Sequence, residues 1–110
     1  MQREYRLTNN ASFNYIYKKG GSIATSIFSI LFVKATSIKV GISVSRKIGK
    51  SVTRSLVKRW IREGFRLLIP DIKIKHNYVV VARPGIEKSN FHFIFNEMLR
   101  LLKKVRHLDG

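Results

Sequence analysis

The sequence predicts an α+β fold in which a small mixed sheet of three to four strands packs with three helices. Apolar residues recur at helical spacing in three stretches, and β-branched or alternating runs lie between them. The predicted order is α-β-β-(β)-α-β-α. A chain of 110 residues, 45% of them hydrophobic, can bury one compact core, so we expect a single domain over residues 1–110.

The first helix is predicted to end near Lys19, because two glycines follow it directly. Its apolar side chains, Phe13, Ile16 and Tyr17, have helical spacing. A polar side chain that accepts the first backbone N–H groups would start the helix. The candidate caps are Thr8, Asn9 and Asn10.

Three stretches predict strands. "IATSIFSILFVKA" (23–35) is β-branched and apolar on both faces, and "KVGISVS" (39–45) alternates apolar with small residues. The short linker between them predicts an antiparallel hairpin. "NYVVVA" (77–82) is the third strand, and the segment between 40 and 82 is long enough for a parallel strand–helix–strand crossover.

The second helix is predicted over 52–68 and the third over 91–106. Pro70 prevents the second helix from continuing, and Ser89 or Asn90 caps the third. At about 100° per residue, the second helix has a cationic side and an apolar side, with Phe65 at the boundary. The cationic side holds Arg54, Lys58, Arg62 and Arg66, with Arg59 just beyond; the apolar side holds Leu56, Val57, Trp60, Ile61, Leu67 and Leu68.

Like charges four residues apart repel one another on a helix, so this row works against helix stability. The chain has 22 Lys and Arg against 6 Asp and Glu, a formal charge of +16. Such an imbalance predicts a polyanionic partner that neutralises the row. The pattern alone leaves RNA, DNA, an anionic membrane surface and a merely solvated basic face open.

Other classes of function are disfavoured. There is no cysteine, which excludes disulfides, thiolate metal sites and a thiol nucleophile. The carboxylates and histidines are scattered, so we expect no catalytic residue and no metal site on the protein. The N-terminus has no apolar segment and no run is long enough to span a bilayer, so we expect a cytoplasmic protein.

The stretch "GISVSRKIGKSVTRSLVKRWIREGFR" resembles the signature of the bacterial ribonuclease P protein subunit. "RLTNNASFNYIYKKG" is similar to the N-terminal segment of that family, and "YVVVARPG" to its last strand and turn, so the resemblance covers nearly the whole chain. It implies a fold like domain 2 of ribosomal protein S5, with a left-handed βαβ crossover. It also implies an RNA-binding set, consisting of Arg46, Lys47, Lys50, Arg54, Ser55, Lys58, Arg59, Arg62 and Arg66.

Two details of the signature matter. Ser55 stands where the family usually has Asn, so a shorter side chain faces the RNA at this position. Glu63 is the only acid between positions 46 and 66, and we expect it to orient Arg59 or Arg66 by an ion pair.

The resemblance also implies a cleft between the first helix and the sheet for the single-stranded 5′ leader of precursor tRNA. Phe13 and Tyr17 match the cleft aromatics, and the third cleft aromatic falls at Leu31, which cannot stack on a base. The alternative is that Phe13 and Tyr17 are core residues. Tyr17, with its polar hydroxyl, is the better candidate for partial exposure.

The implied function is assistance to a catalytic RNA that removes the leader of precursor tRNA. The RNA carries the catalysis and uses Mg²⁺, while the protein binds ribonuclease P RNA and precursor tRNA, one protein per RNA, without cofactor or membrane. A purely structural RNA binder, such as a small ribosomal protein, is the main alternative, and it would not need an aromatic cleft. A membrane-surface binder fits less well, because the apolar side of the basic helix is needed for the core.

Overall fold

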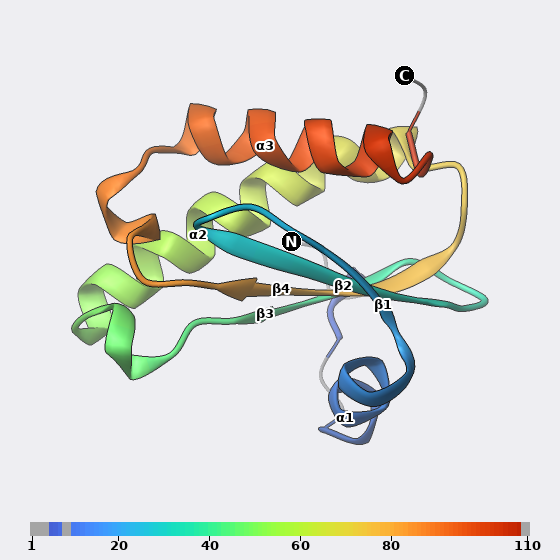
Figure 1. The fold of residues 1–110 in the computed structure, drawn as a ribbon, viewed down its shortest axis with the longest axis horizontal. Coiled ribbons are helices and arrows are strands. Elements are labelled where there is room, and N and C mark those ends of the chain that lie inside the picture. Colours follow the sequence, from blue (N-terminus) through green and yellow to red (C-terminus); the bar gives the residue numbers. More distant parts are fainter. Residues whose placement is uncertain (1–4, 8–9, 109–110) are drawn as a thin grey trace.

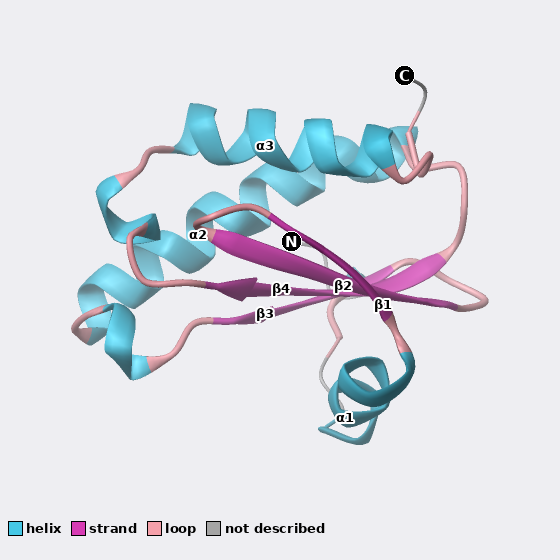
Figure 2. Ribbon diagram, viewed as in Figure 1, coloured by secondary structure: helices cyan, strands magenta, loops and turns pink. Residues whose placement is uncertain are grey.

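The computed structural model describes residues 5–7 and 10–108, and it is an α+β fold with three helices and a four-stranded mixed sheet (Figures 1 and 2). The predicted order of elements is confirmed, and the sheet has four strands, within the predicted three to four. The elements are α1 (Asn10–Lys19), β1 (Gly21–Ala24), β2 (Phe28–Lys34), β3 (Lys39–Ser43), α2 (Ser51–Leu68), β4 (His76–Ala82) and α3 (Phe91–Lys104).

The sheet has the order β1-β2-β4-β3, so β4 lies between β2 and β3. The predicted antiparallel hairpin of β2 and β3 is therefore wrong. β4 pairs antiparallel with β2 and parallel with β3, which confirms the parallel crossover through α2. The physical reason is the continuous apolar run of β4: Tyr78, Val79 and Val80 are completely buried, and such a run belongs at the centre of a sheet covered on both sides.

The predicted single strand over 23–35 is also wrong, because the chain turns at residues 25–27. The Thr25 hydroxyl accepts hydrogen bonds from the backbone N–H groups of Ile27 and Phe28, each at 3.2 Å. The Thr25 N–H donates to the carbonyl of Phe28 at 2.8 Å. This side-chain-closed turn competes with a continuous strand and lets β1 fold back antiparallel on β2.

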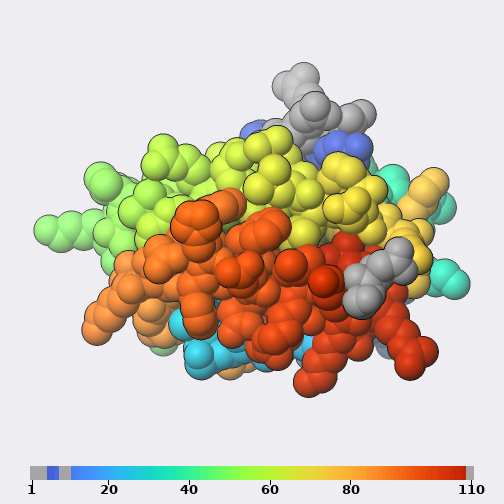
Figure 3. Space-filling view, turned by 90° about the horizontal axis from the view of Figure 1, so that it is seen from above, coloured from blue at the N-terminus to red at the C-terminus, as the bar shows by residue number. Residues whose placement is uncertain are grey.

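One face of the sheet carries the main core, and α2 and α3 lie side by side over it (Figures 1 and 3). Phe65 was predicted at the boundary of α2 but is fully buried, with its ring centroid 5.1 Å from that of Tyr78. The two helices meet closely at Gly64, where a Cβ atom would collide with the Cε of Met98. This close packing explains a glycine that would otherwise only weaken the helix.

Among the described elements, α1 is the only helix over the opposite face of the sheet (Figure 1). Leu7, Ile16 and Val79 form a small buried cluster there. Four further side chains, Phe13, Leu31, Val33 and Val81, are only half-buried against it. This face therefore keeps apolar surface within reach of solvent.

Helix ends follow local capping chemistry. Asn90 caps α3, since its Oδ1 accepts a hydrogen bond from the Phe93 N–H at 2.9 Å. α3 ends at Lys104 rather than at 106, because Arg106 adopts a left-handed backbone with φ of 65°. Two of the predicted caps of α1, Thr8 and Asn9, lie outside the described residues.

Near the C-terminal end of the described residues, His107 packs among aromatic rings on the main-core side of the sheet. His107 is 4% exposed, and its Nδ1 lies 2.8 Å from the hydroxyl of Tyr78. Its ring stacks on that of His76 at 4.3 Å between centroids and meets Phe32 edge-on at 4.9 Å. Burial lowers the pKa of both histidines, and their mutual repulsion lowers that of His107 further.

Candidate nucleic-acid interface

The cationic side of α2 is present as predicted and faces away from the main core. Arg59 and Arg66 are exposed, and Arg54, Lys58 and Arg62 are half-buried. Half-burial brings the side-chain stems against the protein while the charged heads reach solvent. Ser55, the residue that departs from the family pattern, is exposed on the same helix.

The basic segment before α2 contains a short 3-10 turn, Arg46–Ile48. Ile48 is buried at 4% exposure and anchors the turn, while Arg46, Lys47 and Lys50 are exposed. Arg54 joins the turn to the helix, because its Nε donates a hydrogen bond to the carbonyl of Gly49 at 3.2 Å. Arg54 thus has a positioning role in addition to its charge.

Glu63 pairs with Arg66, one of the two partners expected from the sequence. Both Nε and Nη2 of Arg66 donate to Oε2 of Glu63, at 3.1 and 2.8 Å. The hydrogen bond from Arg66 lowers the pKa of the Glu63 carboxyl. The pair is exposed, so it contributes little to stability and mainly fixes the direction of Arg66 at the end of the cationic row.

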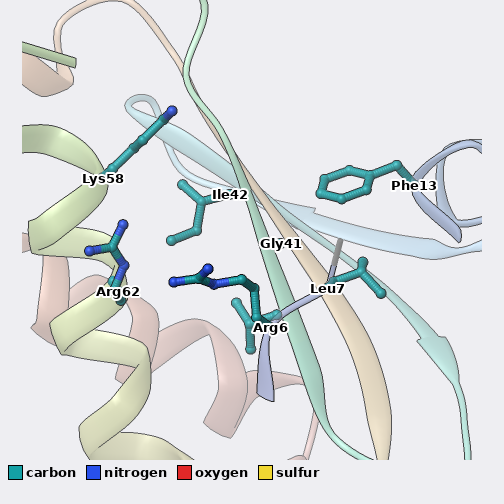
Figure 4. A pocket seen from close by; sticks show the side chains of 8 residues that line it. Arg6, Leu7, Phe13, Gly41, Ile42, Lys58 and Arg62 are labelled. Atoms are coloured by element: carbon teal, nitrogen blue, oxygen red, sulfur yellow. The ribbon is translucent and has the colours of Figure 1, made fainter. Parts of the chain in front are cut away.

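A pocket of about 200 Å³ joins the cationic helix to α1 around the edge strand β3 (Figure 4). Lys58 and Arg62 enter it from α2 on one side of β3, and Phe13 approaches from α1 on the other (Figure 4). Among the residues that the structure describes, none that lines this pocket carries a carboxylate. A polyanion could therefore pass from the cationic helix to the aromatic side of the sheet without being repelled by a described lining residue.

Arg6 is a lining residue that sequence reasoning missed as a site residue. It forms an isolated parallel bridge with Val40, and the Leu7 N–H donates to the Val40 carbonyl at 3.0 Å. These contacts extend the sheet beyond the edge strand β3 and direct Arg6 toward Arg62 (Figure 4). Its position in the "RLTNNASF" stretch, which also contains Phe13, could have indicated Arg6 as a site residue.

Phe13 lies directly over Gly41 of β3. A Cβ atom at Gly41 would enter the Phe13 ring, so only glycine at this position lets the ring rest on the strand. Phe13 is both a packing residue of the small cluster and a lining residue of the pocket. Phe13 therefore fits both predictions, because the same ring packs against the small cluster and lines the pocket.

Tyr17 lies one helical turn after Phe13 and is 47% exposed, so it is not a core residue. Leu31 is half-buried on the sheet face that α1 covers. The structure therefore places all three predicted cleft residues on the same side of the sheet.

Within residues 5–7 and 10–108, no group of three or more His, Cys, Asp or Glu side chains is arranged to hold a metal ion. In the same part of the chain, no helix is both long and apolar enough to cross a membrane.

Comparison with known sequences identifies the family. The family model for Ribonuclease P matches residues 1–106. The ribonuclease P protein component of Alkaliphilus metalliredigens is 36% identical over 108 residues, covering 96% of this chain and 97% of the relative. That of Listeria monocytogenes is 32% identical over 111 residues, covering 98% of this chain and 93% of the relative.

Comparison with solved structures agrees. The ribonuclease P protein of Staphylococcus aureus has a TM-score of 0.86 at 33% identity, with 96% of this chain and 98% of that chain covered. The protein from Thermotoga maritima has a TM-score of 0.81 at 32% identity, again covering 96% and 98%. The match in sequence and fold over almost the full length shows that this chain belongs to the ribonuclease P protein family.

Proposed function

We propose that this chain is the RNA-binding subunit of a ribonucleoprotein ribonuclease P. It binds ribonuclease P RNA through α2 and the turn before it, and it binds the 5′ leader of precursor tRNA on the α1 side of the sheet. The RNA subunit carries the Mg²⁺-dependent endonucleolytic chemistry that produces the mature tRNA 5′ end, with one cytoplasmic protein per RNA.

The observation that carries the proposal is the pocket around β3. It joins Lys58 and Arg62, which suit phosphate contacts, to Phe13, whose half-buried ring offers an aromatic face. Single-stranded RNA needs both kinds of contact, because its backbone is charged and its bases are unpaired. A basic surface that only neutralised duplex RNA would not need the aromatic side.

The cationic residues would act by releasing counterions from the RNA backbone. The repulsion along Arg54, Lys58, Arg62 and Arg66 is then relieved in the complex. On the other side of the sheet, an exposed Tyr17 and the half-buried Phe13 would hold leader bases by stacking, without demanding a particular sequence.

Cleavage of precursor tRNA tests the proposal. The protein is mixed with a bacterial ribonuclease P RNA and a precursor tRNA at low Mg²⁺, where the RNA alone cleaves poorly. Wild type should restore cleavage at the mature 5′ end, and changing Arg54, Lys58 and Arg62 to Ala together should abolish it.

A matched control removes the same charge elsewhere. Changing the exposed residues Lys88, Lys103 and Lys104 to Ala should leave stimulation near the wild-type level. Tight RNA binding without any stimulation by wild type would contradict the proposal and favour a purely structural RNA binder.

The aromatic side has a test of its own on α1. Tyr17→Ala should weaken binding of precursor tRNA to the holoenzyme by about fivefold or more, with little change for mature tRNA. Phe93→Ala is the control, since Phe93 is an aromatic residue with 48% exposure on α3, over the opposite face of the sheet. An equal loss for precursor and mature tRNA in Tyr17→Ala would count against leader binding here.

A further inference from the structure

A second pocket lies where the cationic row of α2 ends, and the proposed function does not use it. Its volume is about 540 Å³, and it is lined by Tyr5, Ser37, Ile38, Arg66, Ile69, Pro70 and Lys75. We infer that this end pocket binds one unpaired nucleotide of ribonuclease P RNA. This inference rests on the proposed function and adds a specific contact to it.

The end pocket is built from three segments that meet beyond the C-terminal end of α2. The Arg6–Val40 bridge sets Tyr5 beside the start of β3, where Ile38 precedes the strand. The connection between α2 and β4 supplies Ile69, Pro70 and Lys75. A hydrogen bond of 3.1 Å from the Ala35 N–H to the Lys75 carbonyl holds the β2–β3 connection against this segment.

Its apolar wall suits a nucleic-acid base. Tyr5 and Ile38 are half-buried and pack against the main core, so the wall is fixed in place. An aromatic side chain beside aliphatic ones offers a stacking surface for any base. The volume lies in the range of pockets that enclose small molecules of this size.

Its charges suit a phosphate. Arg66 is the last member of the row Arg54, Lys58, Arg62 and Arg66, so RNA that follows the row reaches this pocket. Glu63 binds two donors of Arg66 and holds the guanidinium in position, and the remaining N–H groups can meet a phosphate. Lys75 is exposed, and none of the lining residues within 5–7 and 10–108 is acidic.

The geometry therefore assigns the base to Tyr5, Ile38 and Pro70, and the phosphate to Arg66 and Lys75. Stacking and charge respond differently to salt, which separates the two contacts. A lost phosphate contact reduces the slope of log K against log salt by about 0.7 to 0.9, whereas a lost stacking contact leaves the slope unchanged.

The experiment measures binding of the full chain to ribonuclease P RNA at several KCl concentrations. Lys75→Ala should weaken binding severalfold. It should also reduce the slope of log K against log salt by about 0.7 to 0.9, the value for one phosphate contact. Tyr5→Leu keeps apolar packing but removes the ring, and it should weaken binding about fivefold or more with the slope unchanged. Tyr5→Phe, which keeps the ring, should bind as wild type.

Two controls separate this inference from the proposed function. Lys88→Ala removes an exposed charge outside both pockets and should change nothing. Arg54→Ala should weaken binding if α2 contacts the RNA. The end pocket is overturned if Lys75→Ala binds like Lys88→Ala and Tyr5→Leu binds like wild type. The proposed function still stands in that case if Arg54→Ala weakens binding. If wild type does not bind the RNA, both are overturned.

Discussion

The two faces of the sheet differ in how completely they are covered. On the α2/α3 face, Phe65, Tyr78 and Ile94 are among many fully buried side chains, and the helices meet closely at Gly64. On the α1 face, one helix covers a small cluster and leaves Phe13 and Leu31 half-buried. The first face provides the stability that allows the second to keep apolar side chains within reach of a ligand.

This comparison predicts opposite results for two phenylalanines. Phe65→Ala should lower the free energy of unfolding by about 3–5 kcal/mol, because it leaves a cavity in the main core. Phe13→Ala should cost about 1–2 kcal/mol, since the ring is only half-buried, but should strongly weaken binding of precursor tRNA. Urea unfolding followed by circular dichroism measures the first effect and holoenzyme binding the second. Equal stability losses in the two variants would contradict the division of roles.

The contact between Phe13 and Gly41 can be broken from the strand. Gly41→Ala should cost about 1–3 kcal/mol, because the added methyl group must displace the ring. Ser43→Ala, on the same side of β3, is the control and should have little effect. In the double variant Gly41→Ala with Phe13→Leu, the two losses should be less than additive in thermal unfolding. Strict additivity would mean that the two side chains do not meet.

The main core should also respond to acid through two stacked histidines, the half-buried His76 and the buried His107. Both His76 and His107 have pKa values lowered by burial, so the folded state holds them neutral while an unfolded histidine titrates near 6.5. Stability is therefore fully present above about pH 6.5 and is lost as the pH falls below it. Nearby charges act in the same direction, since Lys34 opposes a proton on His76.

Urea midpoints measured between pH 8 and pH 5 would test this expectation. The urea midpoint should fall less between pH 8 and pH 5 for His107→Phe than for wild type, although the variant loses the contact with the Tyr78 hydroxyl. His92→Phe, which changes the exposed histidine at the start of α3, should follow wild type. If His92→Phe reduced the fall of the urea midpoint as much as His107→Phe does, the contact pair His76 and His107 would not be the cause of the acid sensitivity.

The smallest expected effect concerns Leu31 on the α1 face. Leu31→Tyr supplies an aromatic ring at the position where the resemblance to the family implies a third cleft aromatic. We expect precursor tRNA binding to strengthen by up to about tenfold, with the free energy of unfolding nearly unchanged. Equilibrium binding of precursor and mature tRNA, side by side, measures the gain. A weakened precursor complex would place the leader away from Leu31.

Much of this protein could be predicted from local patterns. The three helices, the cap at Asn90 and the cationic row on α2 follow from the spacing of side chains along one element. Arg66 was one of the two predicted partners of Glu63, because residues three and four positions apart on a helix are neighbours. Such features depend on contacts between residues close in sequence, which a single sequence displays directly.

Strand pairing and long-range contacts could not be predicted in this way. The pairing of β2 with β4 rather than β3 depends on which strand is buried on both sides, and the turn at Thr25 depends on one hydroxyl group. The place of Gly41 under Phe13, the direction of Arg6 and the ring contacts of His107 join residues far apart in the chain. The sequence alone determined the three helices, the stretches that form strands and the chemistry of their side chains. Only the tertiary structure decided which side chains meet, because packing selects among pairings that local patterns leave equivalent.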